Sequence, residues 1–311
     1  MRVVFMGTPD FSVGALRALA ENGFDVAAVV TQPDKPRGRG KEFRMTPVKE
    51  AALELGLPVC QPARVRDGAF IETMRAAAPD VIVVSAFGQI IPRALLELPR
   101  YGCINIHASL LPKYRGAAPI QWAVIDGEPV SGVTIMQMDQ GLDTGDMLAK
   151  AQVPLEPGET GGSLFDKLSR TGAELLIRTL PELEAGTLQP EKQPEESPTP
   201  YARMIRKEDG NMDWSLTAEA LERRIRGLNP WPSAYTELDG KILKIWKAEV
   251  LSGESGKTPG TVTEVGRSGL GVQTGKGVLR LLEVQLEGKK RMDADAFLRG
   301  CHVEPGTTLG G

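Results

Sequence analysis

Two polar side chains with complementary chemistry lie two residues apart in the segment Asn105-Ile106-His107. They close a short apolar run, Cys103–His107, that is typical of a buried strand. Because side chains alternate across a strand, Asn105 and His107 share one face. They also lie at the carboxyl end of the strand, where ligands bind on open α/β sheets. An amide beside an imidazole predicts a site that stabilises an oxyanion and moves one proton.

Such a site also needs a carboxylate that orients the imidazole, and the loop Asp139–Asp146 (DQGLDTGD) offers several just after the next predicted strand. A histidine taken alone is more often a satisfied structural residue than a catalytic one. Here its position, its asparagine neighbour and the acidic loop favour a functional role. The chain holds only two histidines, His107 and His302, which excludes a three-histidine zinc site.

The elements that must position these residues alternate between strands and helices in the first half of the chain. Near-continuous apolar strands separated by helices predict an α/β fold, with a Rossmann-like, mostly parallel sheet that is covered on both faces. The predicted strands are Val3–Met6, Val26–Thr31, Asp80–Ala86, Cys103–His107 and Gly132–Met138. The predicted helices are Phe11–Ala20, a helix opened by Thr46-Pro47 that runs to Leu55, and Ser163–Ala185.

The second half has a different organisation. The segment Pro190–Pro200 (PEKQPEESPTP) holds four prolines and three glutamates and no large apolar side chain, which is typical of an extended linker. A helix, Thr217–Arg226, and short strand-like runs separated by glycine-rich turns follow. These runs, Ile242–Val250, Gly260–Val265, Leu270–Thr274 and Gly277–Val284, predict a small closed, OB-like β-barrel. We therefore expect a catalytic domain over residues 1–189, a linker over 190–205 and a barrel over 206–311.

Composition narrows the class of protein. The chain has 311 residues, 41% hydrophobic and 25% charged, with a net charge of -3, so it is not a globally basic nucleic-acid coat. Three widely spaced cysteines without a CxxC pair favour a reducing compartment and exclude a zinc ribbon. The apolar runs are too short for a signal-peptide core or a membrane span. We expect a cytoplasmic protein without a metal.

Longer motifs extend the interpretation of the Asn-x-His pair. The segments NIHASLLPKYRGAAPI and GVTIMQMDQGLDTGDML resemble the folate-dependent formyltransferases. The opening MRVVFMGTPDFS, the loop QPDKPRGRGK and the later segment NPWPSAY extend the resemblance over essentially the whole chain. At that length, the resemblance is to the methionyl-tRNA formyltransferase family.

This resemblance implies a reaction in which a formyl group moves from 10-formyltetrahydrofolate to the α-amine of methionine on initiator tRNA. The catalytic asparagine, histidine and aspartate of the family correspond to Asn105, His107 and Asp143. The residue types suit the chemistry, because Asn105 and a protonated His107 can donate hydrogen bonds to the tetrahedral oxyanion. Asp143 can hold the imidazole and accept a proton as the amine loses its charge.

The resemblance also implies two stretches that contact the folate. The first is Ser109, Leu110, Leu111 and Pro112, and the second is the loop Phe87, Gly88, Gln89, Ile90 and Ile91, which takes the pterin ring through backbone groups. The alternative for the four aliphatic side chains is ordinary core packing. The family often has tyrosine where this chain has Phe87, so no hydroxyl hydrogen bond is expected there.

Two basic segments are the candidate tRNA contacts. The loop Asp34–Arg44 has five basic and two acidic residues, and the resemblance implies that it orders on the acceptor stem. Arg39 is the expected close contact, with Arg37 and Lys41 as phosphate neighbours. A second cluster, Lys289, Lys290 and Arg291, lies in the predicted barrel. For the loop Asp34–Arg44, the alternative is a solvated surface loop.

Other functions remain open at this point. A formyltransferase that acts on an amino-sugar nucleotide would share Asn105, His107 and Asp143 but would not need the basic loop. A hydrolase or dehydrogenase acting on formyltetrahydrofolate is a further option, although a dehydrogenase needs additional domains that 311 residues do not hold. An RNA-binding protein on a degenerate scaffold is a third. Gly7-Thr8-Pro9 is not a dinucleotide fingerprint. We expect a monomer.

Overall fold

The computed structural model describes residues 1–37, 42–253 and 256–310. Contacts divide the chain into two units. The first comprises Met1–Pro119, Val130–Pro154 and Phe165–Ala202, and the second comprises Ile120–Pro129, Leu155–Leu164 and Arg203–Gly311.

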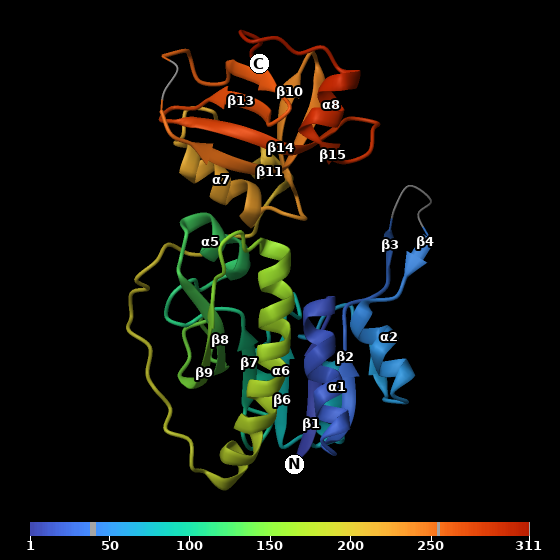
Figure 1. Cartoon of the computed structure of the whole chain (residues 1–311). Coiled ribbons are helices and arrows are strands. Elements are labelled where there is room, and N and C mark those ends of the chain that lie inside the picture. The colour runs from blue at the N-terminus through green and yellow to red at the C-terminus, as the bar shows by residue number, and fades with distance from the viewer. Residues whose placement is uncertain (38–41, 254–255, 311) are drawn as a thin grey trace. The chain divides into compact units, whose positions relative to one another are not determined.

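A seven-stranded sheet organises the first unit, in the order β5-β2-β1-β6-β7-β8-β9 (Figure 1). The strands are β1 (Arg2–Gly7), β2 (Asp25–Val30), β5 (Val59–Cys60), β6 (Val81–Ser85), β7 (Cys103–His107), β8 (Val130–Gln137) and β9 (Met147–Pro154). The pairs from β5 to β7 are parallel, whereas β8 and β9 are antiparallel to their neighbours. The predicted mostly parallel sheet is confirmed.

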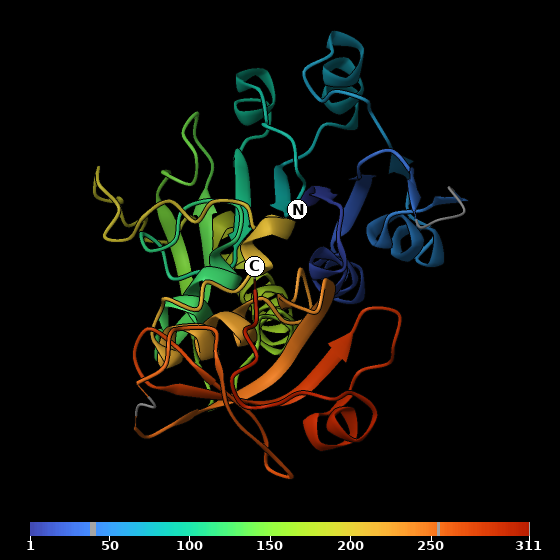
Figure 2. The same ribbon diagram turned by 90° about the horizontal axis from the view of Figure 1, so that it is seen from above.

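Helices cover both faces of this sheet, as the view from above shows (Figure 2). They are α1 (Val13–Glu21), which follows a 3-10 turn at Asp10–Ser12, α2 (Pro47–Glu54), α3 (Gly68–Ala77), α4 (Arg93–Leu96) and α6 (Gly161–Ala185). Helix α6 lies against the face that carries Ile106, where a Cβ on Gly172 would meet the Ile106 side chain at 2.8 Å. Helices α3 and α4 contribute Phe70, Met74 and Leu95 to the core on the opposite face.

Local signals account for several of these elements. Thr46 caps α2, because its hydroxyl accepts a hydrogen bond from the Lys49 amide at 3.1 Å and Pro47 occupies the first helical position. Strand β7 has the bounds predicted from its apolar run. The basic segment Asp34–Arg44, for which the sequence predicts a loop, contains the paired strands β3 (Lys35–Arg37) and β4 (Glu42–Arg44), which stand away from the sheet (Figure 1).

The second unit contains an antiparallel sheet in the order β10-β11-β14-β13-β12, with β15 paired to β14. Its strands are β10 (Ala234–Leu238), β11 (Lys241–Leu251), β12 (Val262–Gly266), β13 (Gly269–Gln273), β14 (Val278–Leu286) and β15 (Met292–Asp293). The remaining elements are α5 (Pro119–Asp126), a 3-10 turn at Lys207–Gly210, α7 (Ala218–Gly227) and α8 (Ala294–Gly300). Strands β11 to β14 and helix α7 match the predicted segments to within a few residues.

The C-terminal segment bridges the two ends of this sheet. Val262 on β12 donates a backbone hydrogen bond to the Thr307 carbonyl at 2.8 Å, and Gly310 donates to the Glu237 carbonyl on β10 at 2.9 Å. Strands β10 and β12 do not pair directly within the described residues. The barrel is therefore closed through residues 306–310, and the predicted fold class is confirmed with this added detail.

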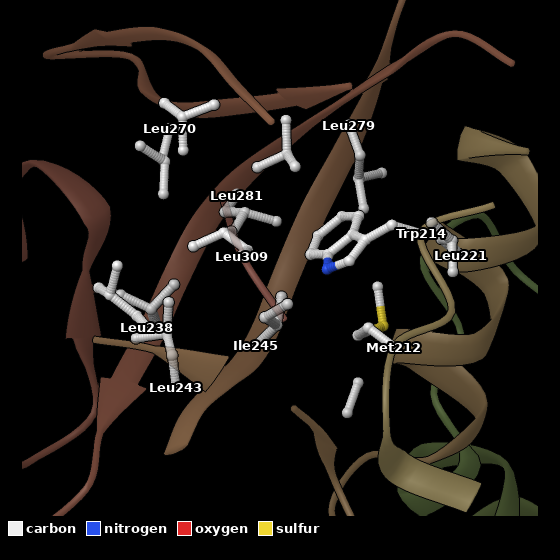
Figure 3. Close-up of a cluster of buried hydrophobic side chains, with 14 of the residues drawn as sticks. Met212, Trp214, Leu221, Leu238, Leu243, Ile245, Leu270, Leu279, Leu281 and Leu309 are labelled. Carbon is white, nitrogen blue, oxygen red and sulfur yellow. The ribbon is translucent and has the colours of Figure 1, made fainter. Parts of the chain in front are cut away.

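The interior of the second unit is an apolar core around Trp214 (Figure 3). Met212 and Leu221 lie beside the indole, and Leu279, Leu281 and Ile245 come from the sheet. The buried indole N–H of Trp214 donates to the Thr236 hydroxyl at 3.1 Å, so its polar atom is satisfied.

Candidate active site

The predicted pair Asn105 and His107 lies on β7, on the face opposite α6. Ile106 points to α6, whereas Cys103, two residues before Asn105, belongs to the core beneath α4. Alternation along the strand therefore places Asn105 and His107 on the Cys103 face. The Asn105 amide makes no hydrogen bond within the described residues, so its donor and acceptor are available to a substrate.

His107 is buried, with 5% of its surface exposed, and an oxygen atom lies near each ring nitrogen. Its Nε2 lies 3.0 Å from the Tyr114 carbonyl oxygen. Because a carbonyl can only accept, Nε2 carries the proton of this bond. Its Nδ1 lies 3.7 Å from Asp143 Oδ1. A protonated imidazole would thus face an acceptor oxygen at each nitrogen.

Asp143 is the carboxylate that the structure brings to the histidine. Its Oδ2 accepts a hydrogen bond from the Gly116 amide at 2.9 Å. Its backbone is left-handed, with φ of 57°, a conformation that aspartate and asparagine tolerate better than most residues. Close packing shapes the same loop, because a Cβ on Gly145 would lie 1.9 Å from the Gln137 carbonyl oxygen. Glycine is therefore required at that position.

The direction of β8 explains why the apolar pattern alone does not predict the position of Asp143. Strand β8 is antiparallel to β7, and its last residue, Gln137, pairs with Ile104 near the start of β7. The acidic loop therefore leaves the sheet at the end opposite His107 and must run back to bring Asp143 to the ring. The rule for carboxyl ends of parallel strands correctly places Asn105 and His107, but not the aspartate.

The predicted folate stretch Ser109–Pro112 follows β7 and is held by Thr134 of β8. The Thr134 hydroxyl donates to the Ser109 carbonyl at 2.7 Å and accepts from the Leu111 amide at 3.0 Å. The Ser109 hydroxyl itself donates to the Lys113 carbonyl at 2.6 Å. Leu111 is buried with Met136 and Met147, so its side chain packs in a core. Leu110 is partly buried.

The second predicted folate stretch, Phe87–Ile91, follows β6. Since Val84 of β6 pairs in parallel with Asn105, the loop leaves the sheet at the same edge as His107. Phe87 and Ile91 are buried in the core under α3 and α4, and Gln89 accepts a hydrogen bond from the Val65 amide at 3.1 Å. Ile90 is 81% exposed, and Gly88 is also exposed. The loop thus offers backbone groups and one apolar side chain, while its other members anchor it.

The basic hairpin can be described at its base. Asp34 bonds Lys49 Nζ at 2.5 Å and Gln61 Nε2 at 2.7 Å, and these contacts lower the pKa of the Asp34 carboxyl. Arg39 and Lys41 lie outside the described residues, and only the backbone of Arg37 is described, at the end of β3.

The cluster Lys289, Lys290 and Arg291 lies between β14 and β15 and is exposed. Its members differ in their contacts. Arg291 forms a two-point ion pair with Glu283, including Nη2 to Oε2 at 2.6 Å, and its guanidinium lies 4.7 Å from the Trp246 ring centroid. Lys289 and Lys290 have no side-chain partner within the described residues. Arg291 therefore supports the barrel surface, whereas the two lysines are available to phosphates.

The sequence pattern missed Arg115 and Gln193, which lie next to Asp143. Both are buried, at 7% and 6% exposure, and Arg115 Nε donates to Gln193 Oε1 at 3.0 Å. Arg115 stands in the KYRGAAP run and Gln193 in the segment predicted as a linker. A single buried arginine produces no periodic sequence pattern, so the sequence does not indicate a role for Arg115. For Gln193, the only signal is a polar side chain within a proline-rich segment.

Two properties bear on the class of site. Among the described residues, no group of three or more histidine, cysteine, aspartate or glutamate side chains could hold a metal ion. No helix in the described part of the chain is long and apolar enough to span a membrane.

Comparisons with known proteins identify the family of the chain. Residues 1–180 match the family described as "Formyl transferase", and residues 204–302 match "Formyl transferase, C-terminal domain". The chain is 59% identical over 307 residues to a protein named methionyl-tRNA formyltransferase from Agathobacter rectalis, covering 99% of each chain.

Two solved structures share the fold. The N-formyltransferase from Helicobacter canadensis, in complex with folinic acid and dTDP-3-aminofucose, matches with a TM-score of 0.65 and 18% identity, over 90% of this chain and 98% of that one. HypX from Aquifex aeolicus, in complex with tetrahydrofolic acid, matches with a TM-score of 0.60 and 19% identity, over 96% of this chain and 47% of that longer one. With the two formyl transferase models matched over residues 1–180 and 204–302 and a full-length relative at 59% identity, the chain belongs to the methionyl-tRNA formyltransferase family.

Proposed function

We propose that Asn105, His107 and Asp143 of this formyltransferase catalyse formyl transfer from 10-formyltetrahydrofolate to the α-amine of methionyl initiator tRNA. The observation that carries the proposal is the fixed arrangement of His107. Its Nδ1 faces Asp143 at 3.7 Å, and its Nε2 bonds the Tyr114 carbonyl at 3.0 Å. The Asn105 amide, which makes no hydrogen bond to the described residues, lies on the same strand face. Attack of an amine on a formyl carbonyl requires a hydrogen-bond donor for the oxyanion and an acceptor for the amine proton, and these three residues can provide both.

The reaction forms one bond and breaks another at the formyl carbon. The lone pair of the amine attacks that carbon, and the carbonyl electrons move onto oxygen to give a tetrahedral oxyanion. Asn105 donates a hydrogen bond to this oxyanion, and a protonated His107 can donate from Nδ1, since Nε2 is engaged. Asp143 accepts the proton that the amine loses. The electron pair on the oxyanion then re-forms the carbonyl as the carbon–N10 bond breaks, N10 takes up the proton that Asp143 accepted, and the formyl amide is released with tetrahydrofolate.

The folate would lie between the two stretches that follow β6 and β7. The loop Phe87–Ile91 presents exposed backbone at Gly88 and an exposed apolar side chain at Ile90, which suits a flat heterocycle with polar edges. Phe87, Ile91 and Leu111 support these stretches from the cores in which they are buried. Ser109, Leu110, Pro112 and Gln89 complete the proposed folate set.

The tRNA would contact the basic hairpin and the barrel lysines. The segment Asp34–Arg44 carries five basic and two acidic residues within a chain of net charge -3. A local excess of positive charge favours contact with the phosphates of an acceptor stem, and tRNA binding should weaken as the salt concentration rises. Arg37, Arg39, Lys41, Lys289 and Lys290 are the proposed contacts, with Arg291 a supporting residue. We expect a monomer that acts in the cytoplasm, where translation is initiated, with a catalytic domain over 1–189 and a tRNA-binding barrel over 206–311.

A formyl-transfer assay tests the proposal directly. The purified chain is mixed with 10-formyltetrahydrofolate and either methionyl initiator tRNA or a dTDP-linked amino sugar, the ligand class of one structural neighbour. We expect formyl-methionyl-tRNA and no formylated sugar. Formylation of the sugar alone would show that the tRNA assignment is wrong. Folate binding without transfer to either acceptor would favour a non-catalytic protein.

A further inference from the structure

The segment after α6 lies along the first unit and bonds to the loops around the candidate site (Figure 1). The Ser197 hydroxyl donates a hydrogen bond to the Pro112 carbonyl oxygen at 2.9 Å, and the Thr199 hydroxyl accepts one from the Tyr114 amide at 2.7 Å. The Ala202 amide donates to the Arg115 carbonyl at 2.8 Å. Although its composition is typical of a linker, this stretch therefore acts as a strap across residues 112–116.

Gln193 connects the strap to the loop that carries Asp143. Its side-chain Nε2 donates to the Asp143 carbonyl at 2.9 Å and to the Gly145 carbonyl at 2.7 Å. Gln193 is 6% exposed, so both bonds are shielded from water. The same loop is held on its other side, where the Asp143 carboxylate accepts from the Gly116 amide. Both the backbone and the carboxylate of Asp143 are therefore fixed.

Arg115 determines which way the Gln193 amide points. Its Nε donates to Gln193 Oε1 at 3.0 Å, which leaves the amide nitrogen to face the loop carbonyls. Its two terminal nitrogens donate to the Glu195 carbonyl at 3.0 Å and the Pro194 carbonyl at 2.6 Å. Within the described residues, this buried guanidinium forms no ion pair. Its hydrogen-bonding capacity is used to hold the strap.

We propose that Gln193 is a positioning residue for Asp143 and that Arg115 orients Gln193 for this task. The proposal rests on the catalytic role proposed for Asp143. Asp143 lies in a left-handed backbone conformation on a loop that must run back along the sheet, so it depends on nonlocal bonds for its place. A displacement of about 1 Å at a catalytic group can cost roughly 100-fold in rate.

Two substitutions distinguish the effect of the hydrogen bonds that Gln193 donates from the effect of its packing. Gln193→Leu removes the amide, whereas Gln193→Glu keeps an acceptor for Arg115 but cannot donate to the loop carbonyls. We expect both variants to lower kcat by roughly 10- to 100-fold, with KM for each substrate changed by less than about twofold. Glu191→Gln is the matched control, because Glu191 is on the same segment and forms an exposed ion pair with Lys150 at 2.8 Å. It should behave like the unmodified chain.

A double-mutant cycle with Asp143→Asn shows whether Gln193 acts through Asp143. If it does, Gln193→Leu and Gln193→Glu should have little further effect on kcat once Asp143 is changed. An equal loss of kcat in both backgrounds would show a general structural role and overturn the inference.

The same cycle distinguishes this inference from the proposed function. A large loss in Asp143→Asn with near-normal kcat in both Gln193 variants would contradict the positioning role and leave the catalytic assignment standing. Near-normal kcat in Asp143→Asn would contradict the catalytic assignment, and the positioning role with it. Thermal unfolding of each variant checks that Gln193→Glu, which retains the Arg115 contact, remains folded.

Discussion

His107 Nδ1 and Asp143 Oδ1 face each other across 3.7 Å, on segments that the chain brings together from opposite ends of β7. The imidazole is fixed by the Tyr114 carbonyl, and the carboxylate is fixed by the Gly116 amide. At 3.7 Å the two groups are close but not hydrogen-bonded, so the Nδ1–H of a protonated His107 stays available to an oxyanion while the carboxylate stabilises its charge. The pair is therefore preorganised, and its two members can be tested separately.

Replacing Asp143 by asparagine should lower kcat by roughly 10²- to 10⁴-fold, because a general base is lost. Asparagine also tolerates the left-handed backbone at this position, so the fold should be preserved. Single-turnover formyl transfer and circular dichroism measure the two effects. Asp146→Asn, at an exposed position in the same loop, is the control and should retain activity. Equal activity in the two variants would show that Asp143 is not the base.

Replacing Asn105 by alanine should lower kcat by roughly 10²- to 10³-fold, the usual cost of removing one oxyanion donor. The amide makes no hydrogen bond with the described residues, so its loss should leave the free energy of unfolding almost unchanged. Asn105→Asp keeps the shape but removes the N–H donor, and it should be as impaired as the alanine variant. Recovery of activity in Asn105→Asp would argue against hydrogen-bond donation by this residue.

The part of the site that could be predicted from sequence is the part that depends on local pattern. The apolar run of β7 determines the face and the edge on which Asn105 and His107 lie, and Thr46-Pro47 marks the start of α2. Strand direction has no such signal, because β8 is buried along most of its length, as a parallel strand in the middle of the sheet would be. The course of the acidic loop to Asp143 therefore followed from the resemblance and not from the periodicity.

The strap was missed for a similar reason. Gln193, Ser197 and Thr199 form no periodic pattern, and their bonds join residues that are about 50 to 85 positions apart in the chain. A segment rich in proline and glutamate cannot build a hydrophobic core of its own. This composition does not exclude hydrogen bonds onto an existing surface.

Substitution of Arg291 and of Lys290 should have different consequences. Arg291→Ala removes an ion pair with Glu283 and a contact over Trp246, and should lower the free energy of unfolding by about 1 kcal/mol. Lys290→Ala should leave stability unchanged and weaken tRNA binding. Urea unfolding and a filter-binding titration separate the two effects. If Arg291→Ala weakened tRNA binding without lowering the free energy of unfolding, Arg291 would be a phosphate contact and not a support for the barrel surface.

Asp209 should make the second unit sensitive to acid. The hydrogen-bonded Arg203 guanidinium lowers the pKa of the Asp209 carboxyl to about 2, from an ordinary value of 3.8. Because the folded-state pKa is depressed, the stabilisation is present above about pH 4 and is lost as pH falls toward about 2. Asp209→Asn should therefore cost about 1–2 kcal/mol at neutral pH, discounted for the half-exposed Arg203, and progressively less in acid.

Urea unfolding between about pH 7 and about pH 3 measures this difference for the unmodified chain and for Asp209→Asn. Glu237→Gln, at an exposed position on β10, is the control and should show no such convergence. A difference that stays constant with pH would mean that Asp209 contributes through its shape and not through its charge.

Arg39 provides the sharpest test of tRNA recognition, although it lies outside the described residues. A single charged contact to phosphate is worth about 1.5–3 kcal/mol, so Arg39→Ala should raise KM for methionyl-tRNA by roughly 10- to 100-fold. The slope of log affinity against log salt should fall by about one. Folate binding, measured by fluorescence titration, should be unchanged. Arg75→Ala, on α3 and paired with Glu72 at 3.3 Å, is the matched control. If Arg39→Ala weakened folate binding as much as tRNA binding, the hairpin would be supporting the fold of the first unit and not contacting tRNA.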